Sequence, residues 1–581
     1  MENPFQRVVA VARRCMLLAG MFSLGVNLLM LTVPLYMLNL YDKVITSKSE
    51  ATLLYLTIIA IFALIVMGSL DLIRSQILVR LGLWADHGLS PVVFSGIIDA
   101  TQTGQTQSTR MLSHVHEIRS FLSSGSILQA LDAPWLPVYM LILWFLHPLI
   151  GLLGFAAACI LLGLAYLNEI TTKRPFQKTG ALLAQAQKDV EATVRNSEVI
   201  TALGMKDNII SRWMTGYIEG LSAAQAANAT SRTILAVAKT IRLTLQLAVL
   251  GLGAYLVLEQ EFTPGMMIAG SILLARALSP VENAIDTWKH LLATREAYTN
   301  LSAFFEKMTA EHAHEKFDLP PPQARLHAEN VVFAYPDKPR AAIRGLDLKI
   351  DPGEVVALIG SSGAGKSTLA QLLAGIRYPD GGTVRLDDIE LLNWPREKLG
   401  PYIGYLPQDV ELFAGSVAEN IGRFSKQDSE AVMLAARIAG VHELIAGLPQ
   451  AYETRIGERG LGLSGGERQR IGLARALYGM PTIVILDEPN ANLDAEGEQH
   501  LLRVVAYLKS QGTTVIFIAH RPSMLQSADR IILMRDGMIE DDGPRDEIMR
   551  KVTRPRSVPI EQTPTEPPGE DGPDHPRAQQ G

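Results

Sequence analysis

The chain has 581 residues, of which 48% are hydrophobic and 19% are charged, and its formal net charge is −6. Its mean hydropathy of +0.16 is high for a soluble protein, and the apolar excess lies in the first 290 residues. The chain therefore divides into an apolar half and an ordinary globular half, and the absence of a basic excess argues against nucleic acid as a partner.

The first apolar run, residues 16–38, is too long for the core of a signal peptide and lacks a convincing cleavage site. We therefore expect a retained first membrane span. The two cysteines, Cys15 and Cys159, lie far apart in apolar runs. This placement predicts reduced, buried core residues and not a disulfide framework.

A membrane span requires about 20 mostly apolar residues, and six segments qualify. They are residues 15–40, 52–73, 127–147, 149–167, 234–258 and 264–281. Arg7, Arg13 and Arg14 precede the first span, whereas the loop at 259–264 is acidic. Positive residues stay on the cytoplasmic side, so both termini and the two long loops, after the second and fourth spans, should be cytoplasmic. The helical spacing of apolar residues in those loops predicts that they extend the spans as helices.

The third span opens with the sequence DAPWLPVYMLILWFLHP at 132–148. Pro134 and Pro137 fall in its first turns, where a missing N–H costs least. Asp132 suits a helix N-terminus because of the helix dipole, and we expect it to be a cap rather than a cargo contact. His147 and Pro148 should form the turn into the fourth span.

Residues 310–325 contain three consecutive prolines and read as a stiff linker after a membrane domain at 1–309. Strand-like and helix-like segments alternate at 326–552, which predicts an α/β domain. Residues 553–581 contain seven prolines and few apolar groups, so we expect a disordered tail.

A phosphate-binding loop, GSSGAGKST, follows the apolar strand VVALIG and precedes a helix. Its glycines let backbone N–H groups turn toward phosphates, Lys366 reaches the β- and γ-phosphates, and the Ser367 hydroxyl ligates Mg²⁺. The residues expected at the nucleotide are Gly360, Ser361, Ser362, Gly363, Ala364, Gly365, Lys366, Ser367 and Thr368. The segment IVILDE at 483–488 is a second motif, in which a strand delivers Asp487 to the metal and Glu488 serves as general base.

The sequence LSGGERQR at 463–470 resembles the signature of ABC-transporter ATPase domains. The resemblance implies that two such domains meet head to tail, so that Ser464, Gly465 and Gly466 of one copy face the γ-phosphate held by Lys366 of the other. Since the chain has one such domain and six spans, it also implies a homodimer with twelve spans, built as six transmembrane helices fused to an α/β ATPase domain.

Further residues match motifs of the same family. Tyr335 matches the aromatic that stacks on adenine, Gln408 the glutamine that contacts Mg²⁺, Asp494 the aspartate that crosses the dimer interface, and His520 the histidine that contacts the γ-phosphate. The segment TRIGERG at 454–460 resembles the exporter loop that touches the partner's cytoplasmic helices. All motifs occur in order, so the resemblance implies an intact ATP hydrolase that uses ATP and Mg²⁺.

The membrane half resembles the permease/ATPase of type I protein secretion, in the branch that exports metalloproteases, lipases and RTX proteins. The resemblance rests on residues 34–45, 132–148 and 194–213. It implies a bacterial inner-membrane protein that exports unfolded polypeptides carrying an uncleaved C-terminal signal. The implied partners are a periplasmic membrane-fusion adaptor and an outer-membrane, TolC-like tunnel protein. About fourteen residues precede the first span, so we expect no N-terminal peptidase domain.

Three cations lie inside predicted spans: Lys239, Arg242 and Arg276. Our hypothesis is that they line the entry cavity and attract acidic segments. The alternative is that Lys239 and Arg242 extend to the headgroups while Arg276 pairs with Glu282 or Asp286. Short helices that dock on the ATPase domains are expected near 110–120 and 203–213.

Two other functions remain open at this point. An exporter of small molecules, lipids or peptides would carry the same ATPase motifs and would differ only in the membrane half. A motor that regulates a partner channel is a second alternative, but the intact Glu488 and His520 argue against it.

Overall fold

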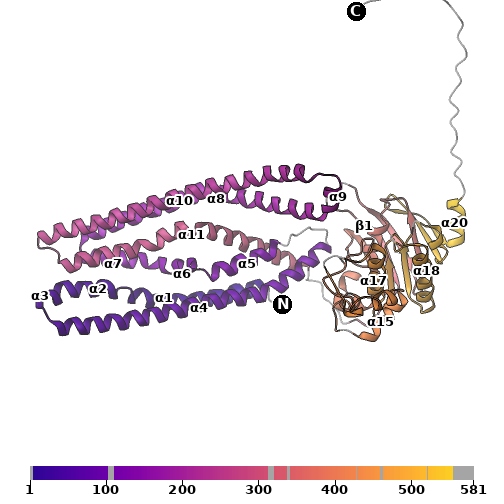
Figure 1. Cartoon of the computed structure of the whole chain (residues 1–581), viewed down its shortest axis with the longest axis horizontal. Helices are drawn as coiled ribbons and strands as arrows, with labels where there is room; N and C mark the ends of the chain where they lie inside the picture. The colour runs from indigo at the N-terminus through magenta and orange to yellow at the C-terminus, as the bar shows by residue number, and fades with distance from the viewer. Residues whose placement is uncertain are drawn as a thin grey trace, which may run out of the picture. The chain divides into compact units, whose positions relative to one another are not determined.

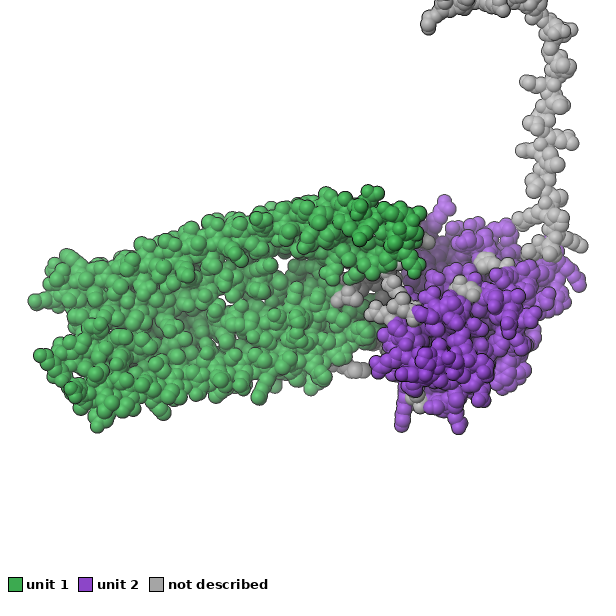
Figure 2. Space-filling model, in the orientation of Figure 1, with its two compact units in different colours: residues 1–101, 105–313 green, residues 102–104, 314–581 purple. Residues whose placement is uncertain are grey.

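The computed structural model describes residues 4–102, 110–311, 319–336, 340–426, 428–457, 462–491, 493–519 and 521–553. The chain forms two compact units (Figure 2). Residues 1–101 and 105–313 make up the first unit, and residues 102–104 and 314–581 the second. We call the second unit the motor domain.

The first unit is entirely helical where it is described (Figure 1). Its helices are α1 Pro4–Leu29, α2 Thr32–Asn39, a π-helical turn Leu40–Val44, α3 Ile45–Ser47, α4 Glu50–Gln102, α5 Arg110–Leu122, α6 Gly125–Asp132, a 3₁₀ turn Ala133–Trp135, α7 Leu136–Leu146, α8 Pro148–Arg195, α9 Ser197–Ala202, α10 Lys206–Leu258 and α11 Pro264–Glu311.

Within the described residues, six helical segments are long and apolar enough to cross a membrane, and each corresponds to one predicted span. The helices run well past the spans: α10 has 53 residues, about 80 Å, against a hydrocarbon core of about 30 Å. The predicted helical extension of the spans is therefore confirmed. The predicted hairpin at His147 is confirmed too, because α7 ends at Leu146 and α8 begins at Pro148.

Of the two expected short helices, the one near 110–120 is confirmed as α5, whereas the one near 203–213 is not a separate helix. Residues 110–120 belong to α5, which packs along α11 and pairs Arg110 with Glu296. Residues 206–213 are the first turns of α10, and the short helix at this end of the unit is α9. Gly204 adopts a left-handed backbone (φ 64°) between α9 and α10, a conformation that commonly ends a helix.

The cysteines were also predicted incorrectly. Both thiols are free, as expected, but Cys15 is half-buried and Cys159 is exposed. The reason is that the surface of a membrane helix bundle is itself apolar, so an apolar run does not imply burial within the protein.

The motor domain is an α/β fold. Its helices are α12 Lys366–Leu373, α13 Arg396–Leu399, α14 Val417–Ile421, α15 Ser429–Ile438, α16 His442–Ala446, α17 Gly465–Leu477, α18 Ala495–Ser510, α19 Pro522–Leu525 and α20 Arg545–Thr553. Its strands are β1 Leu326–Phe333, β2 Ile343–Ile350, β3 Val355–Gly360, β4 Gly381–Leu386, β5 Ile389–Glu390, β6 Ile403–Leu406, β7 Gly415–Ser416, β8 Arg455–Ile456, β9 Ile483–Leu486, β10 Thr514–Ile518, β11 Arg530–Arg535 and β12 Met538–Pro544.

The central sheet has the order β12-β11-β3-β10-β9-β6, parallel except for β12. Strands β3, β9 and β10 are buried on both faces, which matches their continuous apolar sequences. A smaller antiparallel sheet has the order β2-β1-β4-β5. The parallel order brings the carboxyl ends of β3, β6 and β9 to one edge of the central sheet, where ligands bind in such folds.

Candidate functional site

The phosphate loop joins β3 to α12 through residues 361–365. Gly360 and Gly365 have positive φ angles of 150° and 98°. A Cβ at Gly360 would lie 2.2 Å from the Met534 carbonyl oxygen, and one at Gly365 would lie 2.7 Å from that of Ala342. Both positions therefore need glycine, and the loop leaves the first N–H groups of α12 without a side-chain cap. Free N–H groups at a helix N-terminus favour an anion.

Lys366 is 5% exposed, and its Nζ donates to the carbonyl oxygens of Gly360 and Ser361, both at 2.9 Å. Burial lowers the pKa of Lys366, and the nearby carboxylates of Glu488 and Asp487 partly oppose that shift. A desolvated ammonium group held in the loop can form strong, charge-assisted hydrogen bonds with a phosphate group.

Two pairs of side chains converge at the ends of β9 and β6. The Ser367 hydroxyl donates to Asp487 Oδ1 at 3.1 Å, and Gln408 Nε2 donates to Glu488 Oε2 at 3.1 Å. Ser367 lies in the first turn of α12, Gln408 follows β6, and Asp487 and Glu488 follow β9. Hydroxyl and carboxylate oxygens are the ligands that Mg²⁺ prefers, so Ser367 and Asp487 fit a bound magnesium ion.

Glu488 has a left-handed backbone with φ 47°. This conformation costs a non-glycine residue about 1–3 kcal/mol and occurs preferentially at functional sites. Gln469 stabilises the turn, because its Nε2 donates to the Pro489 carbonyl oxygen at 2.6 Å and to that of Glu488 at 3.4 Å. Gln469 is 2% exposed, and the sequence analysis did not assign it a role.

Tyr335 lies beside the phosphate loop. Its hydroxyl is 3.1 Å from Thr368 Oγ1, and its ring meets Phe333 edge-on at 5.2 Å. The Arg377 guanidinium carbon lies 4.8 Å from the centre of the Tyr335 ring. A cation over one face strengthens the packing of the ring, so Tyr335 is held in place next to the helix that begins with Lys366.

The signature residues begin α17. Ser464 is its N-cap: the Ser464 hydroxyl accepts from the Glu467 N–H at 3.3 Å, and Glu467 Oε2 accepts from the Ser464 N–H at 2.7 Å. This reciprocal capping box fixes the start of the helix. The N–H groups of Gly465 and Gly466 therefore lie in its first turn.

Of the last two expected site residues, the structure describes Asp494 but not His520. Asp494 caps α18 by accepting from the Gly497 N–H at 2.8 Å, and its expected role at a dimer interface stays a prediction. His520 lies outside the described residues, as do residues 458–461 of the TRIGERG segment. The residues that follow His520 are anchored by Glu498, which accepts from Arg521 Nη1 at 2.8 Å and from the Ser523 hydroxyl. Sequence reasoning missed Glu498.

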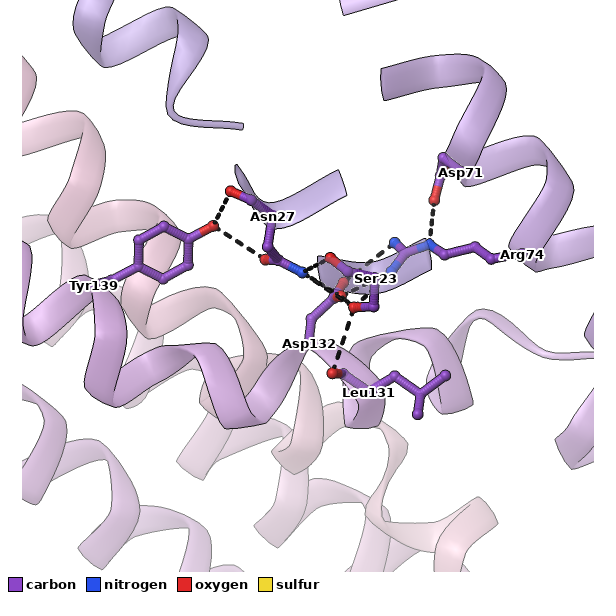
Figure 3. Close-up of polar contacts among 7 residues, drawn as sticks. All are labelled: Ser23, Asn27, Asp71, Arg74, Leu131, Asp132 and Tyr139. Carbon is purple, nitrogen blue, oxygen red and sulfur yellow. Dashed lines mark hydrogen bonds and ion pairs between the residues drawn. The ribbon is translucent and has the colours of Figure 1, made fainter. Parts of the chain in front are cut away.

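A polar cluster lies between the first three spans (Figure 3). It consists of Ser23, Asn27, Arg74, Asp132 and Tyr139. Arg74 Nη1 and Asn27 Nδ2 each donate to Asp132 Oδ1 at 2.7 Å, and the Ser23 hydroxyl donates to the same oxygen. The Tyr139 hydroxyl donates to Asn27 at 3.0 Å. Asp132 is therefore the centre of a network that ties α1, α4, α6 and α7 together.

The expectation that Asp132 caps a helix was wrong. Asp132 is the last residue of α6, and it makes no side-chain cap to the turn at Ala133–Trp135. The two prolines interrupt the third span here, so the carboxylate points to the first two spans instead of along its own helix. The Arg74 guanidinium is buried and requires a counter-charge, and the Asp132 carboxylate supplies it.

A second polar tie joins the first span to the sixth. Asp42, in the π-helical turn, accepts from the Gly265 N–H at 3.0 Å and from the Thr263 hydroxyl at 2.6 Å. It therefore caps α11 from a different helix. A Cβ at Gly265 would lie 2.6 Å from both Asp42 Oδ1 and the Leu38 carbonyl oxygen.

Among the intramembrane cations, Arg242 differs from both hypotheses, whereas the cavity hypothesis stays a prediction for Lys239 and Arg276. Arg242 Nε pairs with Glu282 Oε2 at 2.5 Å, so Arg242 does not extend alone to the headgroups and Glu282 is not the partner of Arg276. Lys239 and Arg276 are exposed and form no hydrogen bond or ion pair with any other described residue.

Residues 16–281 match the family described as ABC transporter transmembrane region, and residues 343–491 match the family described as ABC transporter. A bacterial Atm1-family ABC exporter solved with ATP bound has the same fold, with a TM-score of 0.78 at 24% identity over 94% of this chain and 97% of that one. The fold and the site thus define an ABC transporter, a membrane protein with six apolar helices whose ATPase domain hydrolyses ATP.

The similarity to curated relatives is more specific. The chain is 39% identical to the type I secretion system ATP-binding protein PrsD of Rhizobium meliloti over 93% of both chains. It is 30% identical to the alpha-hemolysin translocation ATP-binding protein HlyB of Escherichia coli, over 92% of this chain and 76% of that one. It is also 30% identical to the cyclolysin secretion/processing ATP-binding protein CyaB of Bordetella pertussis, over 91% and 75%. The chain belongs to the type I secretion system ATP-binding proteins.

Proposed function

We propose that this chain exports unfolded polypeptides across the bacterial inner membrane as a homodimer driven by Mg²⁺-dependent ATP hydrolysis. The observation that carries the proposal is the convergence of the Ser367–Asp487 and Gln408–Glu488 pairs beside Lys366, in a chain whose other half supplies six spans. One chain therefore carries both a site suited to ATP hydrolysis and the helices that cross the membrane.

The roles at the nucleotide follow from these positions. The loop N–H groups of Gly360 to Thr368 and the Lys366 ammonium bind the phosphates, and Tyr335 stacks on adenine. Ser367, Gln408 and Asp487 hold Mg²⁺, which when bound neutralises charge on the phosphate oxygens. Glu488 takes the proton of the attacking water, and His520 contacts the γ-phosphate.

The second copy completes each site. The N–H groups of Gly465 and Gly466 and the Ser464 hydroxyl face the γ-phosphate bound by the other copy, because a helix N-terminus favours an anion. Asp494 lies at the interface between the two motor domains. Two copies thus form two composite sites.

Membership of the type I secretion family supports the remaining assignments. The partners are a periplasmic membrane-fusion adaptor, an outer-membrane tunnel protein and a secreted protein with a C-terminal signal. Both termini and the motor domain are cytoplasmic, in keeping with Arg7, Arg13 and Arg14. The domain organisation is a transmembrane domain at 1–309, a linker at 310–325, a nucleotide-binding domain at 326–552 and a tail at 553–581.

The test is co-purification of cargo with Glu488→Gln from the native membrane. Loss of a general base lowers hydrolysis by about 10²–10⁴-fold, so the variant should retain ATP and bind a polypeptide. Glu430→Gln changes an exposed acid of α15 and serves as the matched control with unchanged hydrolysis. Recovery of lipid alone with Glu488→Gln would contradict protein export.

A further inference from the structure

The last helix of the membrane unit, α11, is its central helix. It packs against α2, α5, α6, α7, α8 and α10 (Figure 1). Its buried residues in the membrane half include Ala269, Leu273, Leu274, Ala277, Leu278, Val281 and Ile285. Helices from four other spans therefore cover most of its circumference.

The remaining face of α11 is polar. Arg276, Ser279, Asn283, Thr287 and His290 follow one another at intervals of three or four residues, which places them on one side of the helix. We call this set the α11 polar stripe. Arg276 and His290 are exposed and the others are half-buried. Within the stripe, Asn283 Nδ2 lies 3.3 Å from the Ser279 hydroxyl.

The part of the stripe from Arg276 to Asn283 lies within the thickness of the membrane. Arg276 is 12 residues beyond the start of α11 at Pro264, about 18 Å along the helix, and Asn283 is about 29 Å along it. The hydrocarbon core is about 30 Å thick. A charge facing lipid there is costly, and such residues face a water-filled cavity or a charged partner. Glu282 pairs with Arg242 instead, and Asp286, ten residues further along α11, lies about 15 Å from Arg276 along the helix.

We propose that the α11 polar stripe lines the aqueous path of the cargo and that Arg276 selects acidic segments of an unfolded polypeptide. This inference rests on the proposed export of polypeptides by a homodimer. In a two-fold dimer each copy presents the same face to the axis. Direct packing of two stripes would bring two Arg276 guanidinium groups together, and their repulsion favours an anionic occupant between them.

The first test measures water access at the stripe. Single cysteines replace Ser279 and Asn283 in a full-length Cys15→Ser/Cys159→Ser background, and inverted vesicles are treated with a sulfonate-bearing thiol reagent. Leu162→Cys and Leu167→Cys are matched controls, because both are exposed apolar residues of α8 that lie about 21 Å and 29 Å from its start, close to the depths of Ser279 and Asn283. We expect reaction at S279C and N283C but not at the controls. Stripe cysteines as unreactive as the controls would overturn the proposal.

The second test measures charge preference. Unfolded peptides of equal length, rich in either glutamate or lysine, compete with labelling of N283C. An exposed ion pair corresponds to about a fivefold preference, so the acidic peptide should protect at about fivefold lower concentration. Arg276→Glu should reverse the order, and Arg276→Lys should preserve it.

Two outcomes separate the proposals. Equal protection by both peptides would overturn the charge selection by Arg276. Labelling at the stripe with no protection by either peptide would instead contradict the proposed export of polypeptides, while leaving the aqueous stripe supported.

Discussion

Replacing Asp132 with alanine would leave the buried guanidinium of Arg74 with a single remaining counter-charge. The side chain of Arg74 is 5% exposed and that of Asp132 is 15% exposed. The remaining partner is Asp71, whose carboxylate lies 2.8 Å from Arg74 Nε but is 52% exposed. Removing one partner of a buried ion pair costs about 3–5 kcal/mol. Because Asp71 retains part of the compensation, we expect Asp132→Ala to lower the free energy of unfolding by about 3 kcal/mol.

Asp71→Asn is the matched control, because it also removes one carboxylate that pairs with the Arg74 guanidinium, but at an exposed position. Exposed pairs contribute about 0–1 kcal/mol, so this variant should remain close to wild type. The assay is detergent-induced unfolding of the full-length protein. In a double-mutant cycle, Arg74→Met combined with Asp132→Ala should cost about 2 kcal/mol less than the sum of the two single changes. The double variant removes both the guanidinium and the carboxylate, whereas each single variant leaves one of these charges buried without its partner. A double mutant whose loss equals the sum would refute this account of the cluster.

Two further predictions concern other contacts. Gly265→Ala should destabilise the membrane unit by about 1–3 kcal/mol because its Cβ would collide with Asp42 and the Leu38 backbone. Gly270→Ala should leave the stability unchanged, because its Cβ would lie 4.0 Å from its nearest neighbours. Equal losses of unfolding free energy in the two variants would exclude the collision as the cause. Hydrogen bonds from Ser523 and Arg521 lower the pKa of Glu498 from its ordinary 4.5. The stabilisation from Glu498 is therefore present above that value and lost as the pH falls through the lowered pKa. Wild type should have a higher Tm than Glu498→Gln at pH 7, and the difference should shrink at low pH; a difference independent of pH would argue against the ion pair.

The motor site was largely predictable because its chemistry is encoded in short segments. The order of Lys366 and Ser367 after a strand determines where the ammonium and hydroxyl lie. The pairing of Gln408 with Glu488 depends on β6 lying beside β9, which the sequence analysis did not predict. Gln469 and Glu498 were missed because hydrogen bonds between distant turns leave no periodic signal.

The polar ties of the membrane half could not be derived from the sequence. Asp132 meets Arg74 and Ser23 across 58 and 109 positions of sequence, and helical periodicity does not fix the register between different helices. A carboxylate before two prolines looks like a cap, but the interruption of the helix at Ala133–Trp135 directs it elsewhere. The motifs at 34–45 and 132–148, first recognised by resemblance, now have a physical role: Asp42 ties the first span to the sixth, and Asp132 ties it to the second and third.

The central claim is that ATP hydrolysis by this chain moves polypeptide across a membrane. The most direct measurement uses inverted vesicles that contain the full-length protein, with an unfolded, acidic polypeptide and ATP supplied outside. The account predicts a protease-protected polypeptide that accumulates with wild type and ATP, and neither with a non-hydrolysable analogue nor with Glu488→Gln. Active hydrolysis with no protected polypeptide, in the presence of the adaptor, would contradict it.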